Sequence, residues 1–259
     1  MLNVFPIPAF KDNYIWALHD QQHAVVVDPG DAAPVRAFLA AHQLRLAAIL
    51  CTHHHHDHVG GICELAEVYN VPVYGPQREI IPCLSHAVGE GDVVQIAQLD
   101  ISLNVLDIPG HTRGHIAFRS TTPAGIFCGD TLFGCGCGRL FEGTPAQLFD
   151  SLQRLASLPD DTPVYCTHEY TAANIRFALA CEPGNNRLRQ REHDTRALRE
   201  LGLPTLPSSI ALEKATNPFL RCASPEIIRS IEQQTGAKLP HGDEVAAFTS
   251  LREWRNNFG

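Results

Sequence analysis

The chain carries, at positions 52–61, the stretch Thr52-His53-His54-His55-His56-Asp57-His58-Val59-Gly60-Gly61. Imidazole and carboxylate groups are the usual protein ligands of zinc and neighbouring divalent cations. The stretch follows the apolar segment 46–51, so a solvated polar face does not explain it. Asp57 interrupts it far from either terminus, which argues against a purification tag. The remaining alternative is a fortuitous histidine loop, which holds only if no further ligands occur downstream.

Three further apolar segments end in histidine or aspartate. The residues at these ends read Pro109-Gly110-His111-Thr112-Arg113-Gly114-His115, Phe127-Cys128-Gly129-Asp130-Thr131 and Val164-Tyr165-Cys166-Thr167-His168-Glu169-Tyr170. Strand ends that meet at one edge of a sheet are a natural place to assemble a site from distant sequence. A single histidine in such a position is more often structural, but four coincidences together indicate an assembled metal site.

The spacing within the first stretch predicts two ligand groups. In an extended segment alternate side chains point the same way, so His53 and His55 can share one ion. Asp57 and His58 can turn towards a second ion as the chain enters a predicted helix from Gly60 to Tyr69.

In combination, these motifs resemble those of the metallo-β-lactamase-fold hydrolases. The segments from Gly129 to Thr144 and from Thr167 to Tyr170, together with the C-terminal region, resemble the glyoxalase II (hydroxyacylglutathione hydrolase) family. The resemblance runs from Ile7 to Phe258 and therefore covers nearly the whole chain.

The resemblance implies an α/β (α+β) fold, an αββα metallo-β-lactamase sandwich followed by a small all-helical C-terminal domain. The residues themselves predict a similar division. Short apolar runs alternate with helical patterns up to about residue 170, as in layered α/β proteins. Helical spacing follows in 171–180, 187–201, 225–235 and 243–258. We therefore expect a catalytic metal-binding domain at 1–170 and a helical substrate-binding domain at 171–259.

The resemblance also implies two divalent metal ions per chain. The first would be held by His53, His55 and His111, the second by Asp57, His58 and His168, and Asp130 would bridge both. Asp57 and Asp130, with a hydroxide bridging the metals, would form the catalytic group. Zinc is the expected metal, and the same ligands also suit iron and manganese.

Several neighbouring residues are not expected to be ligands. His54, His56 and His115 are expected to be structural. For Asp28 two interpretations stay open: it orients a ligand imidazole, or it caps its own Asp28-Pro29-Gly30 turn.

For the substrate, the resemblance implies binding roles for Arg139, Tyr170, Arg252 and Arg255. Arginine can hold a carboxylate bidentately, which suits the carboxylates of glutathione. From the residues alone, Arg252 and Arg255 at i, i+3 spacing would be interpreted as a solvated helix face. Phe141 stands where some family members carry tyrosine, so one hydroxyl contact is expected to be missing.

The implied activity is hydrolysis of S-(2-hydroxyacyl)glutathione, chiefly S-D-lactoylglutathione, to D-lactate and glutathione. This is the second step of methylglyoxal detoxification. A thiolate leaves without protonation, so thioester cleavage needs no general acid. The main alternative is a mononuclear-iron glutathione persulfide dioxygenase, and a lactamase, a lactonase or a non-catalytic metal-binding module are further alternatives.

The composition of the chain excludes several classes of protein function and location. The chain has 259 residues with a net charge of −8, which disfavours nucleic-acid binding. No segment reaches the roughly 18 apolar residues of a membrane-spanning helix, and no signal sequence is recognised. We therefore expect a cytoplasmic monomer with a small-molecule partner. The nine cysteines are expected to be reduced thiols, mostly small buried hydrophobic residues, and Cys135-Gly136-Cys137 is only a weak sign of a metal or redox pair.

Overall fold

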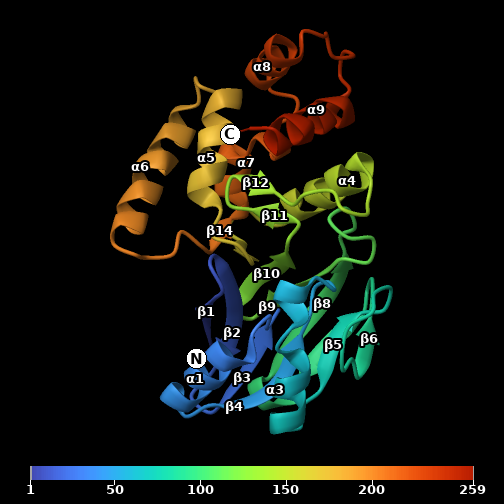
Figure 1. Cartoon of the computed structure of the whole chain (residues 1–259), viewed down its shortest axis with the longest axis vertical. Helices are drawn as coiled ribbons and strands as arrows, with labels where there is room; N and C mark the ends of the chain where they lie inside the picture. Colours follow the sequence, from blue (N-terminus) through green and yellow to red (C-terminus); the bar gives the residue numbers. More distant parts are fainter. Residues whose placement is uncertain (1, 259) are drawn as a thin grey trace.

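The computed structural model describes residues 2–258 and contains two six-stranded sheets with helices packed around them (Figure 1). The first sheet has the order β1-β2-β3-β4-β5-β6, antiparallel from β1 to β3 and parallel from β3 to β6. Its strands are β1 (Asn3–Ala9), β2 (Asn13–His19), β3 (His23–Val27), β4 (Arg45–Leu50), β5 (Val73–Pro76) and β6 (His86–Val88).

The second sheet has the order β14-β13-β10-β9-β8-β7 and is antiparallel except for the parallel pair β10 and β13. Its strands are β7 (Val93–Ile96), β8 (Ile101–Asp107), β9 (Ile116–Thr121), β10 (Ala124–Gly129), β13 (Pro163–Cys166) and β14 (Ser208–Ser209). A small hairpin of β11 (Leu132–Phe133) and β12 (Gly136–Cys137) follows β10.

The first sheet is buried on both faces. Val25 and Val27 belong to the cluster between the sheets, which includes Phe118 of the second sheet. Val26 belongs instead to a cluster with Phe38 of helix α1. Because successive strand residues point to opposite faces, a strand covered on both sides is apolar throughout. This explains the continuous run of valines in β3.

The helices at 32–42 and 62–69 pack on the outer face of the first sheet, the helix at 145–156 packs against the C-terminal helices, and the helices after residue 170 form the C-terminal region (Figure 1). They are α1 (Ala32–His42), α2 (His56–Val59), α3 (Ile62–Tyr69), α4 (Pro145–Ala156), α5 (Thr171–Cys181), α6 (Asn186–Glu200), α7 (Ile210–Thr216), α8 (Pro225–Thr235) and α9 (Glu244–Asn256), with 3-10 turns at Ala97–Leu99 and Pro218–Leu220. Figure 1 shows α5 to α9 gathered at one end of the sandwich. No helix within residues 2–258 is long and apolar enough to cross a membrane.

Most predicted elements occur with small shifts. The helix predicted from Gly60 begins only at Ile62, because Gly60 and Gly61 separate it from the short helix α2. Helix α4 was not predicted, although its start carries a recognisable capping box. The Thr144 hydroxyl accepts from the Gln147 amide, and the Gln147 side chain accepts from the Thr144 amide.

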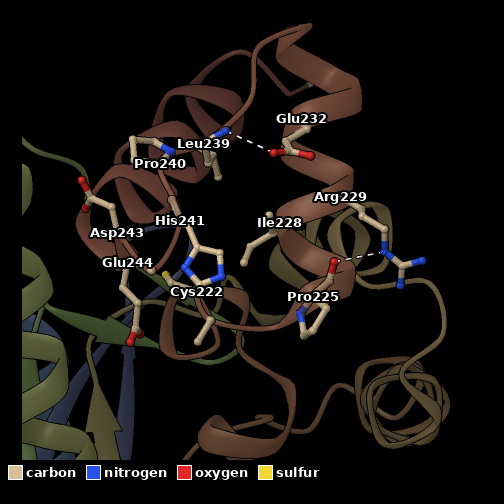
Figure 2. Close-up of a pocket in the computed structure, with 13 residues that line it drawn as sticks. Cys222, Pro225, Ile228, Arg229, Glu232, Leu239, Pro240, His241, Asp243 and Glu244 are labelled. Atoms are coloured by element: carbon tan, nitrogen blue, oxygen red, sulfur yellow. Dashed lines mark hydrogen bonds between the residues drawn. The ribbon is translucent and has the colours of Figure 1, made fainter.

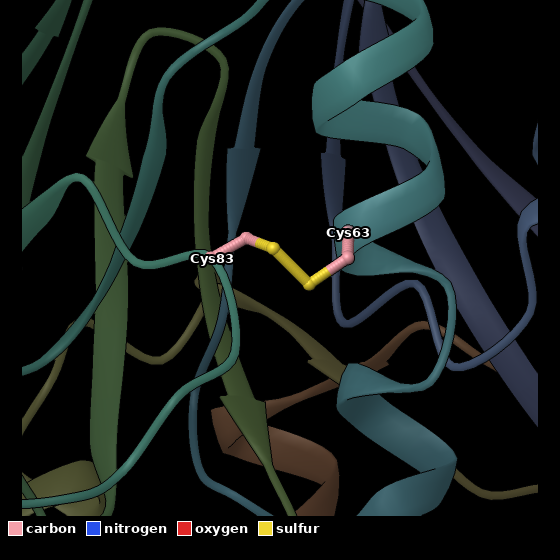
Figure 3. The surroundings of a disulfide bond; sticks show 2 residues. All are labelled: Cys63 and Cys83. Atoms are coloured by element: carbon pink, nitrogen blue, oxygen red, sulfur yellow. A yellow bond between two sulfur atoms is a disulfide. The ribbon is translucent and has the colours of Figure 1, made fainter.

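The prediction that all nine cysteines are reduced is wrong for two of them. Cys63 on α3 and Cys83 on the loop before β6 form a disulfide, with Cα atoms 5.4 Å apart (Figure 3). This separation lies within the usual range for a disulfide. The other seven cysteines are free and buried, as expected for small hydrophobic residues.

The carboxyl ends of the central strands meet at one edge of the sandwich. There the two sheets are joined by main-chain contacts, since the Tyr14 amide donates to the Thr167 carbonyl at 2.7 Å and Asn13 forms a bridge with His168. The loops that follow β4, β8, β10 and β13 start at this edge. It is therefore the place where the predicted ligands converge.

Candidate metal centre and substrate cavity

Three imidazoles form the first group. The Nδ1 atom of His55 lies 3.1 Å from Nε2 of His53 and 3.0 Å from Nε2 of His111. His53 and His55 follow β4, whereas His111 follows β8, so two sheets contribute. Three nitrogens this close to one another could hold a common cation.

The second group combines a carboxylate with two imidazoles. Oδ2 of Asp57 lies 3.6 Å from Nε2 of His58 and 3.5 Å from Nε2 of His168. Asp57 and His58 lie on α2, and His168 follows β13. The structure thus brings together the residues predicted for each of the two groups.

Asp130 lies between the two groups. Its Oδ2 atom is 3.5 Å from Nε2 of His111 and 3.3 Å from Nε2 of His168, while its Oδ1 atom is 3.5 Å from Nε2 of His58. Oδ1 of Asp130 and Nε2 of His58 are buried without a hydrogen-bond partner. Buried polar atoms normally have partners. Their orphaned state therefore fits cations held at this position.

Other residues fix the orientation of these imidazoles through the opposite ring nitrogen. Nδ1 of His58 faces Oδ2 of Asp28 at 3.1 Å, and Asp28 also accepts from the Thr52 amide and hydroxyl, both at 2.7 Å. The carboxylate thus fixes the His58 ring, which favours the first interpretation of Asp28, although Asp28 also belongs, with His53 and His58, to a group that could hold a cation. Such partners select the tautomer that presents Nε2 to a metal.

Three further contacts, two to imidazoles and one to a carboxylate, were not predicted from the sequence. Nδ1 of His168 faces Oδ1 of Asp12 at 2.9 Å, and Nδ1 of His111 faces the Arg139 carbonyl at 2.8 Å. Asn13 donates to Oδ2 of Asp57 at 3.0 Å. Asp12 lies in the turn between β1 and β2 and Asn13 begins β2, both far in the sequence from any metal motif, and only the bridge between Asn13 and His168 could have indicated them.

Electrostatics prepare the site for cations. Burial lowers the pKa of His53 well below its usual value and keeps its imidazole neutral, as a ligand must be. Burial would raise the pKa of Asp130, but the neighbouring His168 and His58 outweigh it and the pKa is lowered. Burial opposes the positive charge of His168, yet Asp130 and Asp12 raise its pKa to about 9. The carboxylates therefore favour positive charge at this edge.

The histidines not expected to be ligands lie around the two groups. The His115 ring stacks on His53 with centroids 4.6 Å apart, and its Nε2 accepts from the Asp130 amide at 3.2 Å. His56 is exposed at the start of α2. His54 contacts Glu79 and Glu142 and also belongs, with His55 and Glu142, to a further group that could hold a cation.

A cavity of about 470 Å³ opens directly onto the metal groups. His111 and Asp130 lie in its wall, and all four residues predicted to bind substrate line it as well, namely Arg139, Tyr170, Arg252 and Arg255. The Tyr170 ring stacks on the His168 ring, with centroids 4.7 Å apart and planes 1° apart. The cavity therefore joins the ligand groups to a cluster of positive charge.

The two arginines of α9 have different surroundings. Arg252 is 5% exposed, so its interpretation as a solvated helix face is wrong. Its Nη1 donates to the Cys137 carbonyl at 2.9 Å, and its guanidinium lies 5.1 Å from the centre of the Phe219 ring. Arg255 is half-buried and donates weakly to Asn174 at 3.4 Å.

The cationic side chains of the cavity repel one another. Burial, followed by the charges of Arg252, Arg139 and Arg176, lowers the pKa of Arg255. Groups of like charge brought together in a cavity favour a ligand of opposite charge. The cavity therefore suits an anion.

A second cavity, of about 520 Å³, lies between α8 and α9 (Figure 2). Figure 2 shows His241 and Ile228 pointing into it, with Cys222 at its base. None of the residues predicted for metal or substrate lines this cavity. The metal groups and their cavity are accordingly the candidate functional site.

Comparison with known proteins agrees with this architecture. Residues 10–168 match the family model of the metallo-beta-lactamase superfamily. Among solved structures, ETHE1 from Myxococcus xanthus is 27% identical with a TM-score of 0.64, covering 97% of this chain and 98% of that one. The structure of TTHA1623 in a di-iron-bound form is 28% identical with a TM-score of 0.60, covering 84% of this chain and 100% of that one. The fold and site define a metallo-β-lactamase superfamily protein.

The family within this superfamily follows from the rest of the chain. Residues 169–258 match the model described as the hydroxyacylglutathione hydrolase C-terminus. The hydroxyacylglutathione hydrolase of Nitrosomonas europaea is 54% identical over 258 residues, covering 100% of this chain and 97% of its relative. The chain belongs to the hydroxyacylglutathione hydrolase family.

Proposed function

We propose that the protein hydrolyses S-(2-hydroxyacyl)glutathione thioesters, chiefly S-D-lactoylglutathione, to D-lactate and glutathione, the second step of methylglyoxal detoxification. The observation that carries the proposal is that one cavity is lined both by members of the metal groups and by three arginines. The full-length relatives named hydroxyacylglutathione hydrolase support it over a persulfide dioxygenase.

The proposed cofactor is a pair of divalent cations, with zinc as the first choice and iron and manganese as alternatives. His53, His55 and His111 would hold one, Asp57, His58 and His168 the other, and Asp130 would contact both. Bound at this place, two such cations acidify water and polarise a carbonyl oxygen. The di-iron form of TTHA1623 supports iron as a candidate.

The side chains of the cavity bind and orient the substrate. Arg139, Arg252 and Arg255 provide positive charge for the carboxylates of glutathione, and guanidinium groups hold carboxylates through paired hydrogen bonds. The Tyr170 ring stacks on His168, and its hydroxyl can form a hydrogen bond with the peptide groups of glutathione. Asp57 and Asp130 are the proposed catalytic carboxylates and would hold the cations beside the thioester carbonyl. The leaving thiolate needs no proton donor, and none is assigned.

The division of the chain into a catalytic domain at 1–170 and a substrate-binding domain at 171–259 belongs to the same proposal. The change from one family match to the other between residues 168 and 169 supports it. A cytoplasmic location and a monomeric state remain predictions, which cell fractionation and size-exclusion chromatography test.

The deciding experiment monitors the ultraviolet absorbance of S-D-lactoylglutathione during incubation with purified protein, with metal quantified on the same sample. Rapid loss of the thioester by protein holding about two metals per chain supports the proposal. A fully metallated sample that leaves the thioester intact refutes it. Oxygen consumption with glutathione persulfide by that sample would establish the alternative activity.

A further inference from the structure

Glu79 carries a buried carboxylate on a largely exposed loop. The loop connects β5 to β6, and the next residue, Ile80, is 93% exposed. The Glu79 side chain is only 3% exposed. A buried carboxylate costs free energy unless it is fully hydrogen-bonded, so its position requires a set of donors.

The donors come from both loops that supply the three-imidazole group. Oε2 of Glu79 accepts from the His54 amide at 2.7 Å and from Nδ1 of His54 at 2.9 Å. Oε1 accepts from the Gly114 amide at 3.0 Å and from the Thr112 hydroxyl. Each oxygen thus serves one loop, and the carboxylate ties the two loops together.

These contacts are made by residues next to the predicted ligands in the sequence, and they hold the main chain that carries those ligands. His54 lies between His53 and His55, so a bond to its amide holds the backbone that presents both imidazoles. Thr112 directly follows His111, the third member of the group. Within residues 2–258 Glu79 forms no hydrogen bond or ion pair with the side chains of His53, His55 or His111, so it acts on the geometry of the group through the adjacent residues.

The packing is built for this close approach. A β-carbon at Gly114 would lie 2.5 Å from Cγ of Glu79, so a larger residue there would displace the carboxylate. The other ring nitrogen of His54 lies 3.1 Å from Oε1 of Glu142, which extends the network to the segment beside Phe141 in the cavity wall.

The Glu79 loop is also anchored at its far end. Cys83 is bonded to Cys63 on α3, the helix that follows the histidine stretch (Figure 3). Strand β5 holds the start of the loop within the first sheet. A side chain on a loop fixed at both ends is suited to holding its partners in one geometry.

We propose that Glu79 is a positioning residue that preassembles the His53, His55 and His111 group for its cation by clamping the two loops that carry it. The inference rests on the proposed function only in that it concerns the same metal centre. Its consequence is a metal affinity that depends on a residue outside the ligand set.

The test compares the variants Glu79→Ala and Glu79→Gln with wild type, and Ile80→Ala serves as a matched control on the same loop. Metal-free protein is titrated with Zn²⁺ against a chromophoric chelator, and the visible spectrum of the Co²⁺ form reports ligand geometry. Loss of such an orienting contact weakens metal binding about 10- to 100-fold, which is the expectation for Glu79→Ala. Glu79→Gln keeps one acceptor oxygen, so its Zn²⁺ affinity should lie between those of Glu79→Ala and wild type. The Zn²⁺ affinity of Ile80→Ala should match wild type.

An unchanged Zn²⁺ affinity and Co²⁺ spectrum in Glu79→Ala would overturn the proposal. Should that variant fail to fold, wild-type affinity in folded Glu79→Gln would overturn it equally. Excess metal should restore kcat for the thioester with KM unchanged, whereas a raised KM at saturating metal would place Glu79 in substrate binding instead. If wild type does not cleave the thioester, the proposed function fails, yet the metal titration still decides the role of Glu79.

Discussion

Replacing Arg252 with alanine should affect both stability and substrate binding, whereas replacing Arg255, whose contacts with Phe177 and Asn174 are longer, should affect mainly binding. The two residues lie one turn apart on α9 and line the same cavity. Only Arg252 is nearly inaccessible to solvent and bonded to a main-chain carbonyl of the β11–β12 hairpin. The pair therefore separates a structural contribution from a binding contribution.

The cost to stability follows from the contacts of Arg252. A hydrogen bond from a charged donor contributes about 1.5–3 kcal/mol. A desolvated cation–π contact, here with Phe219, adds up to about 2 kcal/mol. Relief of the repulsion with Arg255 and of the burial of a charge offsets part of this sum. We expect a net loss of about 2–3 kcal/mol in the free energy of unfolding, or roughly 4–12 °C in Tm for a chain of this size.

The effect on binding should be shared by both variants. Removing one charged hydrogen-bond donor to a carboxylate costs about 1.5–3 kcal/mol, which corresponds to an increase in KM of about 10- to 100-fold. Since both arginines are assigned to substrate binding and neither belongs to the metal groups, kcat should change little. Urea unfolding and steady-state kinetics with S-D-lactoylglutathione measure the two effects. Equal stability of the two variants, or a large fall in kcat with KM unchanged, would refute this reasoning.

Other perturbations test separate parts of the structure. Asp130→Ala should lose bound metal and nearly all turnover, because the carboxylate faces both ligand groups, and near-normal metal content measured on the purified variant would contradict that role. The double variant Cys63→Ser, Cys83→Ser should lower the free energy of unfolding by about 3 kcal/mol, the loop-closure value for a separation of 20 residues. A urea unfolding curve identical to that of oxidised wild type would contradict a stabilising role for this disulfide. Burial would raise the pKa of Glu182, but its hydrogen bonds to Arg221 outweigh burial, so the pKa is lowered in the folded protein. The stability that ionised Glu182 contributes is therefore fully present above the unfolded pKa of 4.5 and is lost as the pH falls through the lower folded pKa. Urea unfolding should accordingly show a steeper loss of stability on acidification for wild type than for Glu182→Gln, and parallel curves would contradict the assignment.

The sequence predicts the fold well where local pattern and burial agree. The helix at 33–42 and the hairpin within 93–108 are present, because their apolar spacing matches the face that each element buries. Strands β1 and β2 were not predicted. In β2 nearly every residue is buried irrespective of alternation, so the period of two that marks a half-buried strand is absent.

For the site, the sequence predicts which histidines and aspartates the structure brings together better than the residues that orient them. His53, His111 and His168 could be recognised because each follows an apolar segment and imidazole is a specific ligand type. Whether Arg252 is exposed could not be determined, because i, i+3 spacing shows which residues share a helix face but not what packs against it. That depends on the β11–β12 hairpin, which lies more than a hundred residues earlier in the chain.

The residues that orient the predicted ligands are difficult to predict from sequence for a general physical reason. A metal ligand must have one of a few chemical types, so its identity restricts its function. A residue that orients a ligand needs only an acceptor at the right place, and the Arg139 carbonyl behind His111 is available from any residue type. Asp12, Asp28 and Glu79 share no spacing with the histidines that they hold, since contacts between strands and loops bring them there. The affinity of the centre for its cations is therefore expected to depend on tertiary packing as much as on the histidine stretch, and variants at these orienting residues should alter metal affinity while the predicted ligand set remains intact.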